Sequence, residues 1–269
     1  MFLARPLAAA FAVAVIGVSL AAQSQVIQPA KAEKTTEVRT LPLAAGSSLK
    51  VANVNGFIHV EAWDREEVQF TGDFKPSSRD EQVKVVIEAT RGSMEIRGEY
   101  PKRSGESYRG PQCQMTLKVP HRLVPTLETV NGDVAISGIQ GRVVISTVNG
   151  GIRATDLADG LKAETVNGGI SLERTKGSLS LQTVNGAIKG SGLDGSGRGI
   201  KVGTVNGSIH LQADGLKGRL QAKTVNGNIA FNAKGAEQVE VNKHRVTAVF
   251  PGSDQTIDLD TVNGSISMD

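Results

Sequence analysis

The stretch from Val143 to Ile170, VVISTVNGGIRATDLADGLKAETVNGGI, contains two copies of a unit that recurs through most of the chain. Its most constant part is the tetrad Thr-Val-Asn-Gly, and a variant, Asn-Val-Asn-Gly, begins at Asn53. The copies from Asn131 to Asn185 are 18 residues apart, and the later spacings are 21, 20 and 37 residues. A period that survives small insertions indicates a stack of repeated structural units. The tetrads begin at Thr129, Thr147, Thr165, Thr183, Thr204, Thr224 and Thr261.

Aliphatic residues alternate with polar ones on both sides of each tetrad. Val or Ile stands two residues after every tetrad Gly, and from the second copy on the residues two and four positions before the Thr are aliphatic. A period of two residues is typical of strands with one buried face. The position just before the Thr includes unpaired charges and must face water, so the Thr is expected to point inward. That position holds Glu128, Ser146, Glu164, Gln182, Gly203, Lys223 and Asp260.

The other tetrad residues carry three further predictions. The Asn is expected to point inward, where its amide can hydrogen-bond to the next Asn at the strand spacing of roughly 4.8 Å. The Gly is expected to take a positive φ. The Val side chains form either an exposed apolar stripe, which would mark a partner or a covering segment, or a column tucked half inside at the corner. This Val column comprises Val130, Val148, Val166, Val184, Val205 and Val225.

These patterns predict an all-β, single-domain parallel β-solenoid with about 18–21 residues per repeat. In such a stack every unit has the same neighbours above and below, so the same residues recur in each column. The alternative is an antiparallel β-sandwich, because Asn-Gly between alternating runs is also a hairpin signal. Within the solenoid, a second set of apolar residues is expected to fill the corner opposite the tetrads: Ile139, Leu157, Leu193 and Leu216.

The first residues are typical of an export signal. Arg5 precedes the uncharged apolar run Leu7 to Leu20, small residues follow at Ala21 and Ala22, and Ala30-Lys31-Ala32 offers a second A-x-A cleavage site. A retained N-terminal anchor is the alternative, and no later segment is apolar enough to span a membrane. We expect a signal peptide over 1–22, with cleavage as late as 32, and a periplasmic or secreted protein. The remaining divisions are a flexible linker over 23–35, an N-terminal cap with irregular β coils over 36–125, the regular solenoid over 126–232, and a C-terminal coil and cap over 233–269.

Composition excludes several classes of function. The net charge of +3 and the aromatic content of 4% provide neither a basic footprint nor stacking platforms for nucleic acid. The single cysteine, Cys113, alternates with polar residues in a predicted strand and is expected to be a buried core residue. The histidines show no paired spacing for a metal ion, and they are His59, His121, His210 and His244.

Parallel β-helices include polysaccharide-acting enzymes, so clustered carboxylates deserve a test. Glu128 and Glu164 share a column but lie two units apart, roughly 9.6 Å, with Ser146 between them. Asp156 and Asp159 share a turn near Arg153. Because the adjacent unit adds no further carboxylate to either group, we interpret both groups as solvated surface charge. We predict no catalytic, cofactor-binding or metal-binding residue.

The tetrads, together with the early segment Gly56 to Asp64 (GFIHVEAWD), resemble an uncharacterised bacterial β-strand-repeat family whose members are commonly labelled as adhesins. The resemblance covers most of the mature chain and implies a right-handed β-helix. It implies no catalytic residue.

The predicted function is a non-catalytic scaffold or adhesin-like binding module of the cell envelope or surface, with an envelope polysaccharide or a surface protein as partner. The alternatives are a polysaccharide-acting β-helix enzyme and an accessory domain of an envelope-stress sensing system. The surfaces favoured for binding are the Val column and a face of mostly small residues at Asp133, Gly151, Gly169, Ala187 and Ser208.

Overall fold

The computed structural model describes residues 22–29, 34–77, 81–101, 110–194, 199–212, 216–232 and 234–269. Nearly all of the predicted signal peptide, and the later cleavage position near 32, lie outside these residues. The described part contains β-strands and no helix.

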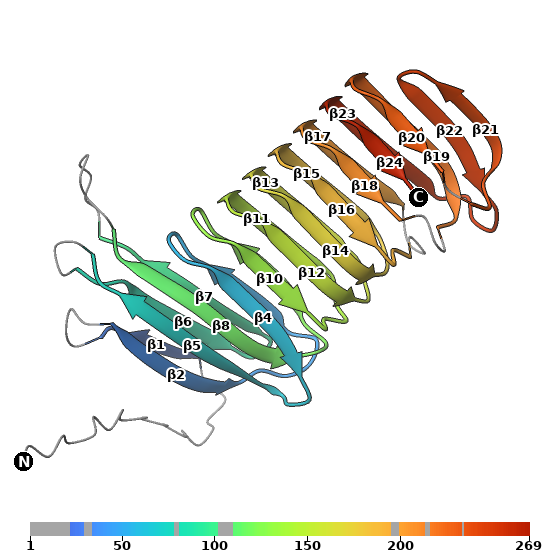
Figure 1. Cartoon of the computed structure of the whole chain (residues 1–269). Coiled ribbons are helices and arrows are strands. Elements are labelled where there is room, and N and C mark those ends of the chain that lie inside the picture. Colours follow the sequence, from blue (N-terminus) through green and yellow to red (C-terminus); the bar gives the residue numbers. More distant parts are fainter. Residues whose placement is uncertain are drawn as a thin grey trace, which may run out of the picture.

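Two long sheets extend along the same axis of the molecule and enclose one core between them (Figure 1). We call the larger one sheet A. Its strands, in spatial order, are β1 (Gln23–Ile27), β6 (Lys84–Thr90), β7 (Ser93–Glu99), β3 (Ser48–Ala52), β9 (Val124–Glu128), β11 (Val143–Asn149), β13 (Leu161–Asn167), β15 (Leu179–Asn185), β17 (Ile200–Asn206), β23 (Thr256–Asn263), β19 (Gly218–Asn226), β22 (Arg245–Phe250) and β21 (Glu237–Asn242).

The other sheet, sheet B, follows the same axis. Its strands, in spatial order, are β2 (Thr35–Pro42), β5 (Glu67–Lys75), β8 (Gln112–Pro120), β4 (Ile58–Trp63), β10 (Val134–Ser137), β12 (Ile152–Leu157), β14 (Ile170–Thr175), β16 (Ile188–Ser191), β18 (Ile209–Leu211), β24 (Ile266–Met268) and β20 (Ile229–Phe231).

The repeat region is a parallel solenoid, as predicted. Each coil contributes one strand to sheet A and the next to sheet B, with the tetrad at the corner between them. Successive coils pair in parallel and in column register, so that Thr147 faces Thr165 in sheet A and Ile152 faces Ile170 in sheet B. The aliphatic columns of both sheets form one continuous buried core. The residues predicted to fill the opposite corner, Ile139, Leu157, Leu193 and Leu216, are all buried.

The tetrad Thr points inward, as predicted, and is only about 5% exposed. Its hydroxyl donates to the tetrad Gly carbonyl of the neighbouring coil, for example from Thr165 Oγ1 to Gly150 O at 2.9 Å. The hydroxyl is therefore satisfied inside the stack, which removes the penalty for burying a polar group.

The tetrad Asn makes the predicted ladder but on the outside, so the prediction of an inward Asn was wrong. Asn167 Nδ2 donates to Asn149 Oδ1 at 2.8 Å, and Asn185 Nδ2 donates to Asn167 Oδ1 at 2.9 Å. The strict alternation ends at the Val, and Val and Asn are both exposed as the chain turns. At the first coil, Asn131 Nδ2 donates to Asn55 Oδ1 at 2.8 Å, and the Tyr100 hydroxyl donates to the Asn55 carbonyl at 3.0 Å.

The tetrad Gly is required for a reason that the sequence did not suggest. Gly56 has a φ of 129°, but Gly150 and Gly168 are not in the left-handed region, so the predicted positive φ was wrong for the regular coils. A Cβ on Gly168 would instead overlap the carbonyl of Gly150 in the adjacent coil. The corner backbones stack so closely that no side chain fits between them.

The N-terminal part contains antiparallel pairing, which in the repeat region occurs only at the β19–β22 edge and in the β21–β22 hairpin among the described strands. β5 pairs antiparallel with β2 and β8, and β6 pairs antiparallel with β1 and β7. The prediction of a flexible linker over 23–35 was wrong at 23–27, because β1 is an edge strand of sheet A. Cys113 is buried in β8, as predicted.

The spatial order of the coils departs from the chain order at both ends. The coil of β3 and β4 lies between the coil of β7 and β8 and the coil of β9 and β10. The coil of β23 and β24 lies between the coil of β17 and β18 and the coil of β19 and β20. The hairpin of β21 and β22 then covers the sheet A edge beyond β19 (Figure 1).

Candidate functional site

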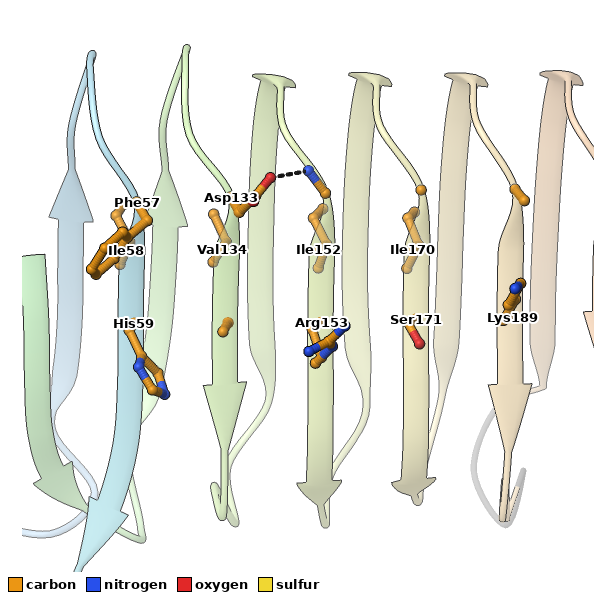
Figure 2. A pocket seen from close by; sticks show the side chains of 14 residues that line it. Phe57, Ile58, His59, Asp133, Val134, Ile152, Arg153, Ile170, Ser171 and Lys189 are labelled. Atoms are coloured by element: carbon orange, nitrogen blue, oxygen red, sulfur yellow. Dashed lines mark hydrogen bonds between the residues drawn. The ribbon is translucent and has the colours of Figure 1, made fainter. Parts of the chain in front are cut away.

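The outer face of sheet B carries a groove of about 600 Å³ across the strands β4, β10, β12, β14 and β16 (Figure 2). We call it the sheet B groove. It runs along the solenoid axis because it is lined by equivalent positions of successive coils. Two columns form it: the residue directly after the tetrad, and the residue two positions further on.

The first column is the floor of the groove. It contains the glycines Gly151 and Gly169 together with Ala187, so backbone is open to a ligand there. Phe57 closes one end of the groove with its ring. Asp133 projects at the rim, and its Oδ1 accepts a hydrogen bond of 2.7 Å from the backbone nitrogen of Gly151 (Figure 2).

The second column is basic at every other coil. In register order it contains His59, Ala135, Arg153, Ser171 and Lys189. Arg153 and Lys189 lie two strand spacings apart, roughly 9.6 Å, with Ser171 between them. We call His59, Arg153 and Lys189 the basic column. Among the residues that the structure describes, no acidic side chain forms an ion pair with Arg153 or Lys189.

Four of the five residues of the predicted small-residue face line this groove, and Ser208 does not. Sequence reasoning missed the basic column. Its signal was available, because each of these residues directly follows the buried Val or Ile after the tetrad. Only the register between coils shows that they form one line beside the floor.

A second groove, of about 870 Å³, follows the tetrads on the outer face of sheet A. Val184, Val205, Val225 and Val262 line one side of it. In the Val column, the residues from Val130 to Val205 are between 38% and 41% exposed. Val262 has the same exposure, and Val225, on the last tetrad strand of sheet A, reaches 63%. The Val column is thus a surface stripe. The other side carries charges of both signs, including Asp260, Lys223 and Arg245.

Of the carboxylates considered for catalysis, Glu128, Glu164 and Asp156 each lie beside a different basic side chain. Glu128 lies 3.6 Å from Lys50 and Glu164 lies 3.0 Å from Lys162, with Ser146 between the two acids as predicted. Asp156 accepts hydrogen bonds from Arg174, at 2.6 and 3.0 Å, and not from the nearby Arg153. This hydrogen-bonded pair lowers the pKa of Asp156 and raises the pKa of Arg174.

The histidines are dispersed over the molecule, as predicted. His121 lies 3.2 Å from Asp64 at the N-terminal end, and His210 contacts Ser267 in sheet B. Across the described ranges, no three potential ligands from His, Cys, Asp and Glu converge on one point. Burial, with a smaller contribution from Asp73, raises the pKa of the Cys113 thiol to about 12.

The described residues include no helix that is long and apolar enough to cross a membrane. Comparison with curated proteins finds no sequence match.

Comparison with solved structures finds several bacterial proteins of low sequence identity. A protein from Clostridium sporogenes whose name proposes a role in cell adhesion is 11% identical, with a TM-score of 0.42 over 88% of this chain and 99% of its own. A protein from Bacteroides fragilis named as a proposed adhesin is 14% identical, with a TM-score of 0.45 over 88% and 99%. A protein from Parabacteroides distasonis named for proposed lipid binding is 12% identical, with a TM-score of 0.39 over 87% and 96%.

The model of one protein family, described as Toastrack DUF4097, matches residues 124–269. This match spans more than half of the chain and includes the seven Thr-Val-Asn-Gly tetrads and the sheet B strands from β10 on. The chain belongs to the Toastrack DUF4097 family.

Proposed function

We propose that the protein is a non-catalytic binding module of the bacterial cell envelope or surface, periplasmic or secreted, which holds an extended acidic polysaccharide along the sheet B groove. The observation that carries the proposal is the basic column beside a floor of glycine and alanine. Arg153 and Lys189 are exposed and without an ion pair within the described residues, so their charges are available to a ligand.

The shape of the groove suits a linear polymer. It is open along the solenoid axis, and its basic positions recur at every second coil from Arg153 to Lys189. A chain with anionic groups at regular intervals can therefore place one group at Arg153 and another at Lys189. Arg also binds carboxylate and phosphate in a bidentate manner. The ring of Phe57 provides an apolar surface for a sugar at the end of the groove.

The acids give no support to an enzyme that acts on such a polymer. General acid–base hydrolysis of glycosides needs two carboxyl groups across one bond. Here the sheet B groove contains Asp133 alone among its lining residues, and that carboxylate accepts from backbone. Glu128 and Glu164 lie on the opposite sheet and each lies beside a lysine.

Binding to polygalacturonate and to neutral dextran, measured by calorimetry or co-sedimentation with the supernatant assayed for released sugar, tests the proposal. We expect binding of the acidic polymer alone, weakening with salt because exposed charges are screened, and no released sugar. Arg153→Ser with Lys189→Ser should weaken binding at least about tenfold. A hydrogen bond to a charged group contributes about 1.5–3 kcal/mol, and 1.4 kcal/mol is a tenfold change.

Serine is a suited replacement because Ser171 occupies the same column naturally. The matched control is Lys176→Ser with Lys201→Ser, which removes the same charge outside the groove. Equal weakening in both variants would show only a general effect of charge. Release of sugar would refute the non-catalytic assignment.

A second candidate is a dedicated protein partner at the Val column, as in an accessory domain of an envelope-stress sensing system. The exposure of six regularly spaced valines favours it, since contiguous apolar surface marks interaction sites. Failure to bind any acidic polymer, together with a specific crosslink from the Val column to an envelope protein in cells, would support this candidate instead.

A further inference from the structure

The last coil of the solenoid lies in a slot between two earlier coils. We call residues 256–269, which contain β23 and β24, the C-terminal coil. β23 pairs in parallel with β17 on one side and with β19 on the other, and β24 pairs with β18 and β20. The slot is therefore bounded by coils that both precede it in the chain.

Both walls of the slot present the same pattern to the C-terminal coil. On the β17 side, Asn263 Nδ2 donates to Asn206 Oδ1 at 2.8 Å and Thr261 Oγ1 donates to the Gly207 carbonyl at 3.0 Å. On the β19 side, Asn226 Nδ2 donates to Asn263 Oδ1 at 2.8 Å, and Thr224 Oγ1 donates to the carbonyl of Gly264 at 2.9 Å.

The interior of the slot is equally specific. The aliphatic side chains of the C-terminal coil are fully buried between those of the neighbouring coils, at Ile257, Leu259, Ile266 and Met268. A segment that fills the slot must therefore provide a strand, the tetrad corner and a second strand in this register. The occupant with that chemistry is another C-terminal coil.

A short exposed connection joins the C-terminal coil to the rest of the fold. Residues 251–255 link β22, which lies outside β19, to β23, which lies inside it, so this connection passes across β19. Pro251 to Asp254 are exposed, and Gly252 has a φ of 101°. Gln255 stays with the C-terminal coil, because its carbonyl accepts a hydrogen bond of 2.8 Å from the backbone nitrogen of Arg219 in β19. The exposed stretch from Pro251 to Asp254 can extend while that contact is kept.

We propose that the C-terminal coil exchanges between two copies of the chain, so that each copy fills the slot of the other and a swapped dimer forms. Every contact of the coil in the monomer is reproduced in the dimer, so only the hinge and the entropy of association distinguish the two forms. The dimer fraction therefore rises with protein concentration, while the short tether favours the monomer at low concentration.

The test uses two full-length variants, Lys201→Cys in one and Asp258→Cys in the other. These positions face each other across β17 and β23. Neighbouring strands lie roughly 4.8 Å apart, inside the Cα window of about 4.4–6.8 Å for a disulfide. The variants are refolded together at high concentration and oxidised after folding. We expect a covalent heterodimer, because the two thiols meet only if the coil of one chain lies in the slot of the other. Cys113 is buried and stays outside the reaction.

Two controls make the result decisive. Ser180→Cys occupies the same outward column on β15, one strand beyond β17, so with Asp258→Cys it should give at least tenfold less heterodimer. A single chain with both Lys201→Cys and Asp258→Cys, oxidised while monomeric, should remain monomeric by light scattering at all concentrations. Reduction should restore the dimer. A mixture that stays monomeric, heterodimer no more abundant than in the Ser180 control, or dimers in the oxidised double variant would overturn the proposal.

Discussion

At the residue scale, the tetrad glycine has the most stringent position in the fold. The carbonyl of Gly150 occupies the space that a Cβ on Gly168 would need, and that carbonyl belongs to backbone that is itself held in the stack. We expect Gly168→Ala to lower the free energy of unfolding by about 3 kcal/mol or more, since overpacking forces backbone to move.

Gly203→Ala is the matched control for Gly168→Ala. A Cβ there has only the carbonyl of Asp260 nearby, at 4.0 Å. The urea concentrations at the unfolding midpoints of the two variants should therefore differ widely, with that of Gly203→Ala close to the wild-type value. Similar midpoints would contradict the close approach of the corner backbones.

The buried threonine hydroxyl is expected to contribute a smaller amount. Thr165→Val keeps the shape of the side chain but removes the hydrogen bond to Gly150 O, so the loss should be about 1 kcal/mol. Urea unfolding measures it, with Thr165→Ser as the variant that retains the hydroxyl. A loss in the serine variant but none in the valine variant would assign the effect to packing of the methyl group.

The tetrad illustrates the limit of single-residue reasoning. The direction of the Thr could be predicted, because charged neighbours such as Glu164 must face water and the strand alternates. The direction of Asn167 could not, because alternation fails where the chain leaves the strand. The reason for the Gly was also hidden, since it depends on a carbonyl 18 residues away in the chain.

At the element scale, the Val column is the clearest case where two interpretations were open. Val166 is 40% exposed on β13, whereas Ile170 on β14 is buried. Val166→Asp should therefore lower the free energy of unfolding by no more than about 1 kcal/mol, a value typical of exposed strand positions. Ile170→Asp should prevent stable folding, because it buries an unpaired charge. Comparable destabilisation by both changes, measured by urea unfolding, would place Val166 in the core.

The pH dependence of stability should reveal the burial of Cys113 in β8. Its pKa is about 12 in the folded protein, against 9.0 as the ordinary value, so the folded chain retains this proton where the unfolded chain has lost it. Stability should therefore fall as pH rises from about 9 towards 12, by up to about 1.4 kcal/mol per pH unit.

Cys113→Ala should remove this contribution to the alkaline slope of the unfolding free energy. The Cys113 thiol should also stay unreactive towards a thiol reagent at pH 8 until the protein is unfolded. Identical alkaline slopes for wild type and Cys113→Ala, or rapid labelling of the native protein, would contradict a buried neutral thiol.

The sheet B groove could be predicted only in part at this scale. The floor residues Gly151 and Gly169 stand out in the sequence because they are small at a repeated position. The basic column does not, because Arg153 and Lys189 alternate with Ala135 and Ser171 and look like scattered surface residues. The parallel, in-register pairing of the sheet B strands places these residues in one line.

At the scale of the whole molecule, the order of the coils is the feature that the sequence left undetermined. β17, β19 and β23 have equivalent columns, so β17 could pair with either of the other two and still place aliphatic residues and a Thr against its own interior side chains. The structure pairs it with β23.

A crosslinking experiment on dilute single chains tests this order. In the structure Lys201 faces Asp258, whereas Gln221 lies on the far side of β23, two strand spacings or roughly 9.6 Å from Lys201. Lys201→Cys with Asp258→Cys should oxidise readily within one chain, and Lys201→Cys with Gln221→Cys should not, because the latter exceeds the disulfide window. The opposite outcome would show coils stacked in chain order.

The sequence alone determined the all-β class, the parallel stack, the buried columns and the inward Thr, because these follow from local alternation and from a period that places identical residues above one another. Tertiary structure alone decided the order of the coils at both ends, the antiparallel pairing in the N-terminal part, and the alignment of Arg153 and Lys189 beside a glycine floor. The physical reason is the repeat itself. Identical coils specify how neighbours fit together, but they cannot specify which copies become neighbours, and that choice depends on the connections between the coils.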